Sequence, residues 1–117
     1  MEVTLHWAKG ALFENMIMAD LIKNYYNRAN RPLLFFGRDN TGNEVDCLID
    51  EGNIVKSIEI IEIKASTTIN SSFFNGLTYY SKLNNTSLPY LVYRGTEDFK
   101  RQKAHIVSWD NINSIID

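Results

Sequence analysis

The sequence predicts an α/β domain, and three patterns lead to that class. Residues 57–64 are rich in β-branched side chains and apolar on both faces, which is typical of a strand in the middle of a sheet. Residues 10–28 carry apolar side chains at helical spacing, which predicts a helix that ends before Pro32. Turn-forming residues at 39–43 and 50–53 separate extended segments. The predicted order is helix, three strands, helix and strand.

The apolar spacing places each element in turn. We expect Gly10 to start the first helix, with apolar side chains along one face at Leu12, Phe13, Ile17, Leu21 and Tyr25. The other expected elements are strands near 33–38, 43–50 and 54–64, a helix over 70–83 capped by Asn70 or Ser71, strands at 89–93 and 105–108, and a terminal helical turn capped by Asp110.

Length and composition limit the number of domains. With 117 residues, 44% of them hydrophobic, the chain can bury one core but not two. The single cysteine, Cys47, excludes an internal disulfide, and within a predicted strand we expect it to be a small buried hydrophobe. No apolar run approaches the roughly 20 residues of a membrane span. We therefore expect one cytoplasmic domain over residues 1–117.

Charged residues on the predicted central strand indicate a functional site. Glu62 and Lys64 are two residues apart, so their side chains point to the same side of the strand. Such a pair costs desolvation unless it meets partners, water or a metal. Asp46, on the preceding strand, is the candidate partner. A connection of about four residues would place Asp46 opposite residues 57–60, so contact with Glu62 would require a bulge or a bend.

These motifs resemble the PD-(D/E)xK nuclease-like superfamily, and more closely the uncharacterised domain at the C-terminal end of many bacterial and archaeal AAA-type ATPases. The resemblance spans nearly the whole chain and rests on residues 10–15 (Gly-Ala-Leu-Phe-Glu-Asn) with Leu21, residues 42–46 (Gly-Asn-Glu-Val-Asp), and residues 61–64 (Ile-Glu-Ile-Lys) followed by Ser66. It implies a restriction-endonuclease-like α/β fold, in which helices flank a central mixed sheet. Strands one to three would be antiparallel and strand four parallel to strand three.

The resemblance also implies a role for each residue of the site. Asp46 and Glu62 would be catalytic metal ligands, Glu14 would complete the metal site, and Lys64 would orient the attacking water. Carboxylate oxygens suit Mg²⁺ or Mn²⁺. The implied activity is metal-dependent hydrolysis of nucleic acid. The implied partner is an AAA-type ATPase domain, so the chain would be the C-terminal part of a larger ATPase or a stand-alone relative.

A noncatalytic alternative stays open. The net charge of −2 and the scattered basic residues argue against tight nonspecific nucleic-acid binding by this domain alone. Many nucleases of the superfamily carry a glutamine and a tyrosine on the helix after the lysine, where this chain offers Asn75 with Tyr79 or Tyr80. Glu62 and Lys64 could also form a plain ion pair. The alternative is a nuclease-like module that binds protein or nucleic acid without catalysis.

Overall fold

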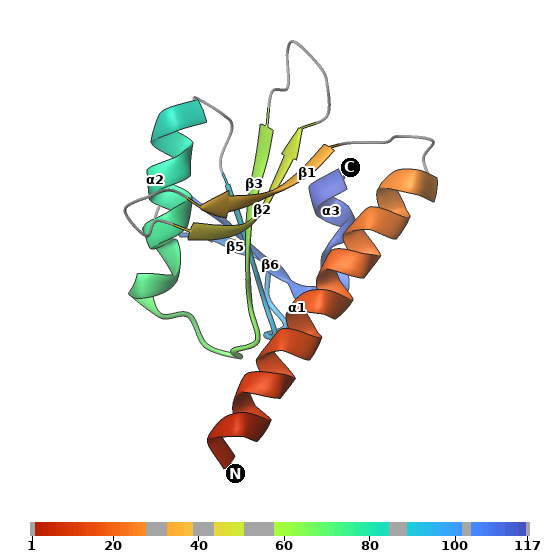
Figure 1. Cartoon of the computed structure of the whole chain (residues 1–117). Helices are drawn as coiled ribbons and strands as arrows, with labels where there is room; N and C mark the ends of the chain where they lie inside the picture. Colours follow the sequence, from red (N-terminus) through yellow and green to blue (C-terminus); the bar gives the residue numbers. More distant parts are fainter. Residues whose placement is uncertain are drawn as a thin grey trace.

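The computed structural model describes residues 2–27, 33–38, 44–50, 58–84, 89–101 and 104–116 (Figure 1). The elements, in chain order, are α1 (Glu2–Asn27), β1 (Leu33–Arg38), β2 (Glu44–Asp50), β3 (Ile58–Lys64), the 3₁₀ helix η1 (Ser71–Phe74), α2 (Asn75–Asn84), β4 (Tyr90–Tyr93), β5 (Phe99–Arg101), β6 (Ala104–Ser108), the 3₁₀ helix η2 (Trp109–Asn111) and α3 (Asn113–Ile116). The predicted order of helix, three strands, helix and strand is confirmed.

The strands form one six-stranded mixed sheet in the order β1-β2-β3-β4-β6-β5. Strands β1, β2 and β3 pair antiparallel, whereas β4 pairs parallel with both β3 and β6. The parallel pairing follows from the crossover through η1 and α2, which returns the chain to the end of the sheet where β3 began. The predicted pairing of the first four strands is confirmed. The short β5, antiparallel to β6, was not expected, because three exposed residues show no clear apolar alternation.

Helices cover both faces of this sheet, and each face has its own core (Figure 1). Helices α1 and α3 pack on one face and α2 packs on the other. Strand β3 supplies Ile61 and Ile63 to the α1 side and Ile60 to the α2 side. Burial on both faces is what its continuous apolar sequence predicted. The sheet is therefore the middle of three layers.

Helix α1 begins at Glu2, so the expectation that Gly10 starts it is wrong. Gly10 lies inside the helix, and a Cβ built there meets nothing within 4 Å. Figure 1 shows the first turns of α1 projecting beyond the sheet. A helix has an apolar stripe only where it faces a core. The first turns of α1 therefore have no apolar spacing in the sequence that would mark them as helical. Leu12 also departs from the predicted buried face, with 67% of its surface exposed.

The second helical segment begins where the sequence indicated. The Asn70 side chain accepts a hydrogen bond from the Ser72 amide at 2.9 Å and caps η1, which leads directly into α2. Gly76 is buried against β2, and a Cβ on it would lie 1.8 Å from the Glu44 carbonyl oxygen. Only glycine allows α2 to approach the start of β2 so closely.

The terminal helical turn is present, but Asp110 does not cap it. Ser108 occupies the N-cap position of η2, and its hydroxyl is 2.7 Å from the Gly95 carbonyl oxygen and also contacts the Asp110 carboxylate. Ile112 and Ile115 are buried against α1 as part of the core on that side. The apolar spacing located this segment, whereas the capping residue was assigned wrongly.

Candidate active site

The register of β2 and β3 places Asp46 level with Glu62. Asp50 lies opposite Ile58 and Cys47 opposite Ile61. Continuing this antiparallel register by one residue brings Asp46 opposite Glu62. The expected pairing of Asp46 with residues 57–60 is therefore wrong. The error arose from the turn, because β3 begins at Ile58 and residues 51–57 make a longer connection than the expected four. Contact with Glu62 needs no bulge between these two strands.

The regular strand pairing gives way to side-chain contacts at Asp46. The Ile63 amide donates a hydrogen bond to Asp46 Oδ2 at 2.6 Å, and the Asp46 amide donates to Glu62 Oε1 at 3.2 Å. Each carboxyl group thus binds a backbone amide of the neighbouring strand. Reciprocal bonding of this kind holds the two acidic side chains together.

A bulge on the other side of β2 redirects its side chains at the same place. The pairing of β1 with β2 shifts between Phe35 and Gly37, so that one residue of β1 faces two of β2. Val45 packs in the core on the α2 side and Cys47 in the core on the α1 side, although residues two apart normally share a face. The bulge therefore reverses the alternation of β2 around Asp46.

Glu62 is 8% exposed, and its surroundings favour the protonated form. Burial is the largest cause that raises its pKa, to about 9, followed by the hydrogen bond and the negative charge of Asp46. The positive charge of Lys64 lowers the pKa but does not cancel these effects. At neutral pH the Glu62 carboxyl group is therefore protonated.

Lys64 is held beside this pair by an aromatic ring. Its ammonium lies 5.4 Å from the centre of the Phe73 ring, which is within the range of a cation–π interaction. The apolar spacing of residues 70–83 places Phe73 on one face of the helix with Leu77 and Tyr80, and that assignment of Phe73 to the core is wrong. Phe74 is the buried residue, and Phe73 contacts Lys64.

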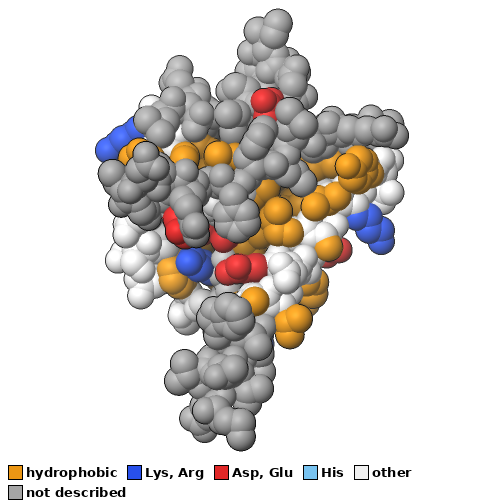
Figure 2. Space-filling view, viewed as in Figure 1, with side chains coloured by type: hydrophobic (Ala, Val, Ile, Leu, Met, Phe, Trp, Pro, Cys, Tyr) orange, Lys and Arg blue, Asp and Glu red, His pale blue; other side chains and the backbone are white. Residues whose placement is uncertain are grey.

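Glu14 approaches the same region from α1. It is half-buried, and its pKa is raised first by that burial and then by the charge of Asp46, while Lys64 lowers it. Figure 2 shows acidic side chains next to a basic one on the face between α1 and α2. Among the residues that the structure describes, no three His, Cys, Asp or Glu side chains lie close enough to hold a metal ion. The structure thus brings Asp46 and Glu62 into contact, with Lys64 and Glu14 within electrostatic range, and their catalytic roles stay predictions.

The six-stranded mixed sheet, with helices on both faces and two acidic residues hydrogen-bonded across β2 and β3, defines an α/β domain with a candidate acidic site. The chain belongs to the family described as "Domain of unknown function (DUF4143)", whose family model matches residues 9–112. No curated protein matches the chain significantly.

A solved structure shares this fold. It is a chain of the refined half-complex from the tetradecameric assembly of Thermococcus gammatolerans McrB AAA+ hexamers with bound McrC. The TM-score is 0.60 at 17% sequence identity, and the match covers 85% of the present chain but 27% of the other. The present domain therefore resembles one part of a much longer protein. Among the described residues, no helix combines the length and apolar character needed to cross a membrane.

Proposed function

We propose that this domain is a metal-dependent nuclease that hydrolyses phosphodiester bonds. The observation that carries the proposal is the contact between Asp46 and Glu62 at the point where hydrogen bonds to side chains replace the strand pairing, with Lys64 two residues further along β3. A structural role alone does not call for two carboxyl groups and an ammonium on two adjacent inner strands, because charged groups are costly to bury. Phosphodiester hydrolysis uses both kinds of group.

The acidic pair has the donor chemistry of a Mg²⁺ or Mn²⁺ site. Asp46 and Glu62 offer hard carboxylate oxygens, and the proton on Glu62 is one that a divalent cation would displace. Mg²⁺ commonly takes only one or two carboxylates and keeps several waters, so two protein ligands are enough. We propose Glu14 as a further ligand, either directly or through water. A bound cation would activate a water molecule and neutralise charge on the phosphate.

Lys64 would act on the phosphate and on the attacking water. Its ammonium contributes positive potential beside the carboxyl pair, where negative charge develops during hydrolysis. The Phe73 ring restricts the flexible lysine side chain, so less entropy is lost when it engages a substrate. Phe73 is therefore proposed as a positioning residue for Lys64.

We further propose that the domain works with an AAA-type ATPase, as part of the same protein or in a complex. The motifs of the sequence support this association, and so does the similarity in fold to one part of a chain in an assembly of McrB AAA+ hexamers with bound McrC. The domain's own net charge of −2 gives little affinity for phosphate groups, so a partner would supply most of the affinity for nucleic acid.

Calorimetric titration with Mn²⁺ tests the metal site. We expect saturable binding by the wild type, loss of binding in Asp46→Asn and Glu62→Gln, and unchanged binding in the control Glu97→Gln, whose side chain is exposed outside the site. Lys64→Met should keep the metal but lose cleavage of single- and double-stranded DNA and RNA. Absence of binding by the folded wild type, or equal binding by all variants, would overturn the proposal.

One observation favours the noncatalytic alternative. Each carboxyl group already accepts a backbone hydrogen bond from the neighbouring strand, as a purely structural connection between strands would require. In that case Asp46→Ala should unfold the domain markedly, because the buried Ile63 amide loses its partner at a cost of about 1–3 kcal/mol, and the wild type should not bind Mn²⁺. A module that binds partners without catalysis would then be the better description.

A further inference from the structure

A row of side chains crosses the sheet on its α1 side, away from the acidic pair. The strand register aligns Ile61, Tyr90, His105 and Lys100 on four neighbouring strands, β3, β4, β6 and β5. The rings of Tyr90 and His105 stack with their centres 5.1 Å apart and an interplanar angle of 23°. The row therefore runs from a buried aliphatic side chain, through two half-buried rings, to an exposed ammonium.

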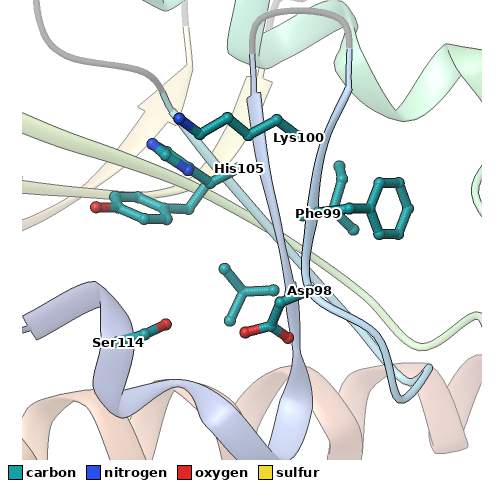
Figure 3. Close-up of a pocket in the computed structure, with 8 residues that line it drawn as sticks. Asp98, Phe99, Lys100, His105 and Ser114 are labelled. Carbon is teal, nitrogen blue, oxygen red and sulfur yellow. The ribbon is translucent and has the colours of Figure 1, made fainter.

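Beside this row lies a hollow of about 310 Å³. Its lining includes Tyr90, Asp98, Lys100, His105, Val107 and Ser114. Figure 3 shows Lys100 and His105 together at one end, with Asp98 and Ser114 towards the other. Its volume is at the lower end of the range for small-molecule pockets. The hollow is lined by rings and aliphatic groups and has polar side chains at both ends.

The two ends have opposite hydrogen-bonding character. Lys100 can only donate, and its charge sits beside His105, whose pKa is lowered by burial and then by Lys100. The Asp98 carboxylate accepts hydrogen bonds from the Ser108 amide at 2.8 Å and from the Asn111 side chain, and it can accept more. The Ser114 hydroxyl donates to the Asn111 carbonyl oxygen at 2.9 Å, which leaves its oxygen as an acceptor. One end therefore suits an anion, and the other suits hydroxyl or amino groups.

We propose that this hollow is a binding site for a nucleoside phosphate, with the phosphate at Lys100 and His105 and the hydroxyl or amino donors at Asp98 and Ser114. The Tyr90 and His105 rings and the Val107 side chain would contact the apolar surface of the ligand. The ligand could be a free nucleotide or the terminal nucleotide of a strand, since both present the same groups. The site lies at the β5 edge of the sheet and shares no residue with the acidic pair.

Binding of adenosine and guanosine monophosphates, a short single-stranded oligonucleotide and inorganic phosphate can be compared by NMR titration in EDTA. EDTA removes divalent cations, so failure of the nuclease proposal would not affect the result. The informative variants are Lys100→Met, which removes the charge but keeps the aliphatic stem, and His105→Phe, which keeps the ring. Lys82→Met is the matched control, since Lys82 is an exposed lysine on α2 outside the hollow.

We expect a nucleotide or the oligonucleotide to shift the resonances of Tyr90, His105 and Val107. Loss of one charge-assisted hydrogen bond in Lys100→Met should weaken binding about tenfold. His105→Phe should weaken binding as well, and Lys82→Met should not. Binding of the free nucleotide would identify it as the source, and binding of the oligonucleotide alone would identify a strand end. No binding by either, equal weakening in Lys82→Met, or inorganic phosphate binding as tightly as the nucleotide would overturn the proposal.

Discussion

Replacement of Glu62 by Gln should change how the stability of the domain depends on pH. Burial and the neighbouring Asp46 raise the pKa of Glu62 in the folded state to about 9, from an ordinary value of 4.5. Between these two values the folded protein binds a proton that the unfolded chain has released. The stabilising effect of that proton is complete below the unfolded pKa and is lost as pH rises through the folded pKa. The wild type should therefore lose stability from about pH 5 to pH 9.

The size of the effect follows from linkage. One proton held only by the folded state gives a slope of about −1.4 kcal/mol per pH unit. From the ordinary pKa to pH 7 the wild type would lose on the order of 3 kcal/mol. The glutamine side chain of the Glu62→Gln variant would not titrate, and its amide group can donate to Asp46 as the protonated glutamic acid does. The free energy of unfolding of Glu62→Gln should therefore rise relative to that of the wild type as the pH increases.

Urea denaturation at pH 5, 6, 7 and 8, in EDTA, measures this difference as a change in the free energy of unfolding. Groups common to both proteins, such as His105, cancel in the comparison. Glu97→Gln, which alters an exposed carboxyl group, should give a curve parallel to that of the wild type. Parallel curves for the wild type and Glu62→Gln would refute the raised pKa of Glu62 in the folded state. Addition of Mg²⁺ should stabilise the wild type but not Glu62→Gln.

Four further predictions concern packing and burial. Gly76→Ala should lower the free energy of unfolding by about 2 kcal/mol in urea denaturation, because its Cβ would collide with the Glu44 carbonyl oxygen. Gly10→Ala, a helical glycine with open space around it, should instead stabilise by about 0.5–1 kcal/mol, and equal effects at the two glycines would contradict the close approach of α2 to β2. Cys47 is fully buried, with its pKa raised to about 12 by burial and then by Asp46, so an aromatic disulfide reagent at pH 8 should label it only on unfolding. Rapid labelling of the native protein would show that this part of β2 opens. Ile17→Ala should cost about 2–5 kcal/mol, measured the same way, because the side chain has no exposed surface in the α1-side core; a loss below about 1 kcal/mol would place α1 outside the cooperative core.

The central part of the fold could be predicted because its sequence signals are local. Strand β3 is apolar on both faces, and only a strand covered on both sides of a sheet satisfies that pattern. The spacing of Phe13, Ile17, Leu21 and Tyr25 likewise fixed the buried face of α1. The start of α1 and the short β5 were missed, because neither requires a periodic apolar face. The register of β2 with β3 depended on the length of their connection, which composition does not determine.

The acidic residues of the candidate site could be found from sequence, but their arrangement could not. Asp46, Glu62 and Lys64 were identifiable because charge on buried strands is costly and demands an explanation. Phe73 had the same spacing as a core residue, and only the structure shows that its neighbour Phe74 takes the core position. The bulge beside Asp46 left no signal either. It depends on how β1 pairs, a contact between segments that no local pattern describes.

Three features together position the acidic pair. The absence of a side chain at Gly76 lets α2 pack directly on the backbone at Glu44, which holds the first residues of β2. The bulge against β1 accommodates one extra residue and reverses the alternation of β2, so that Val45 packs towards α2 and Cys47 towards α1. Asp46 lies between them and is bonded to β3 in two ways: its carboxylate accepts from the Ile63 amide, and its own amide donates to the Glu62 side chain. These two contacts, of Gly76 with Glu44 and of β1 with the bulge, hold β2 around Asp46. A substitution that weakens either one should therefore move the two carboxyl groups apart, even though the substituted residue contacts neither of them.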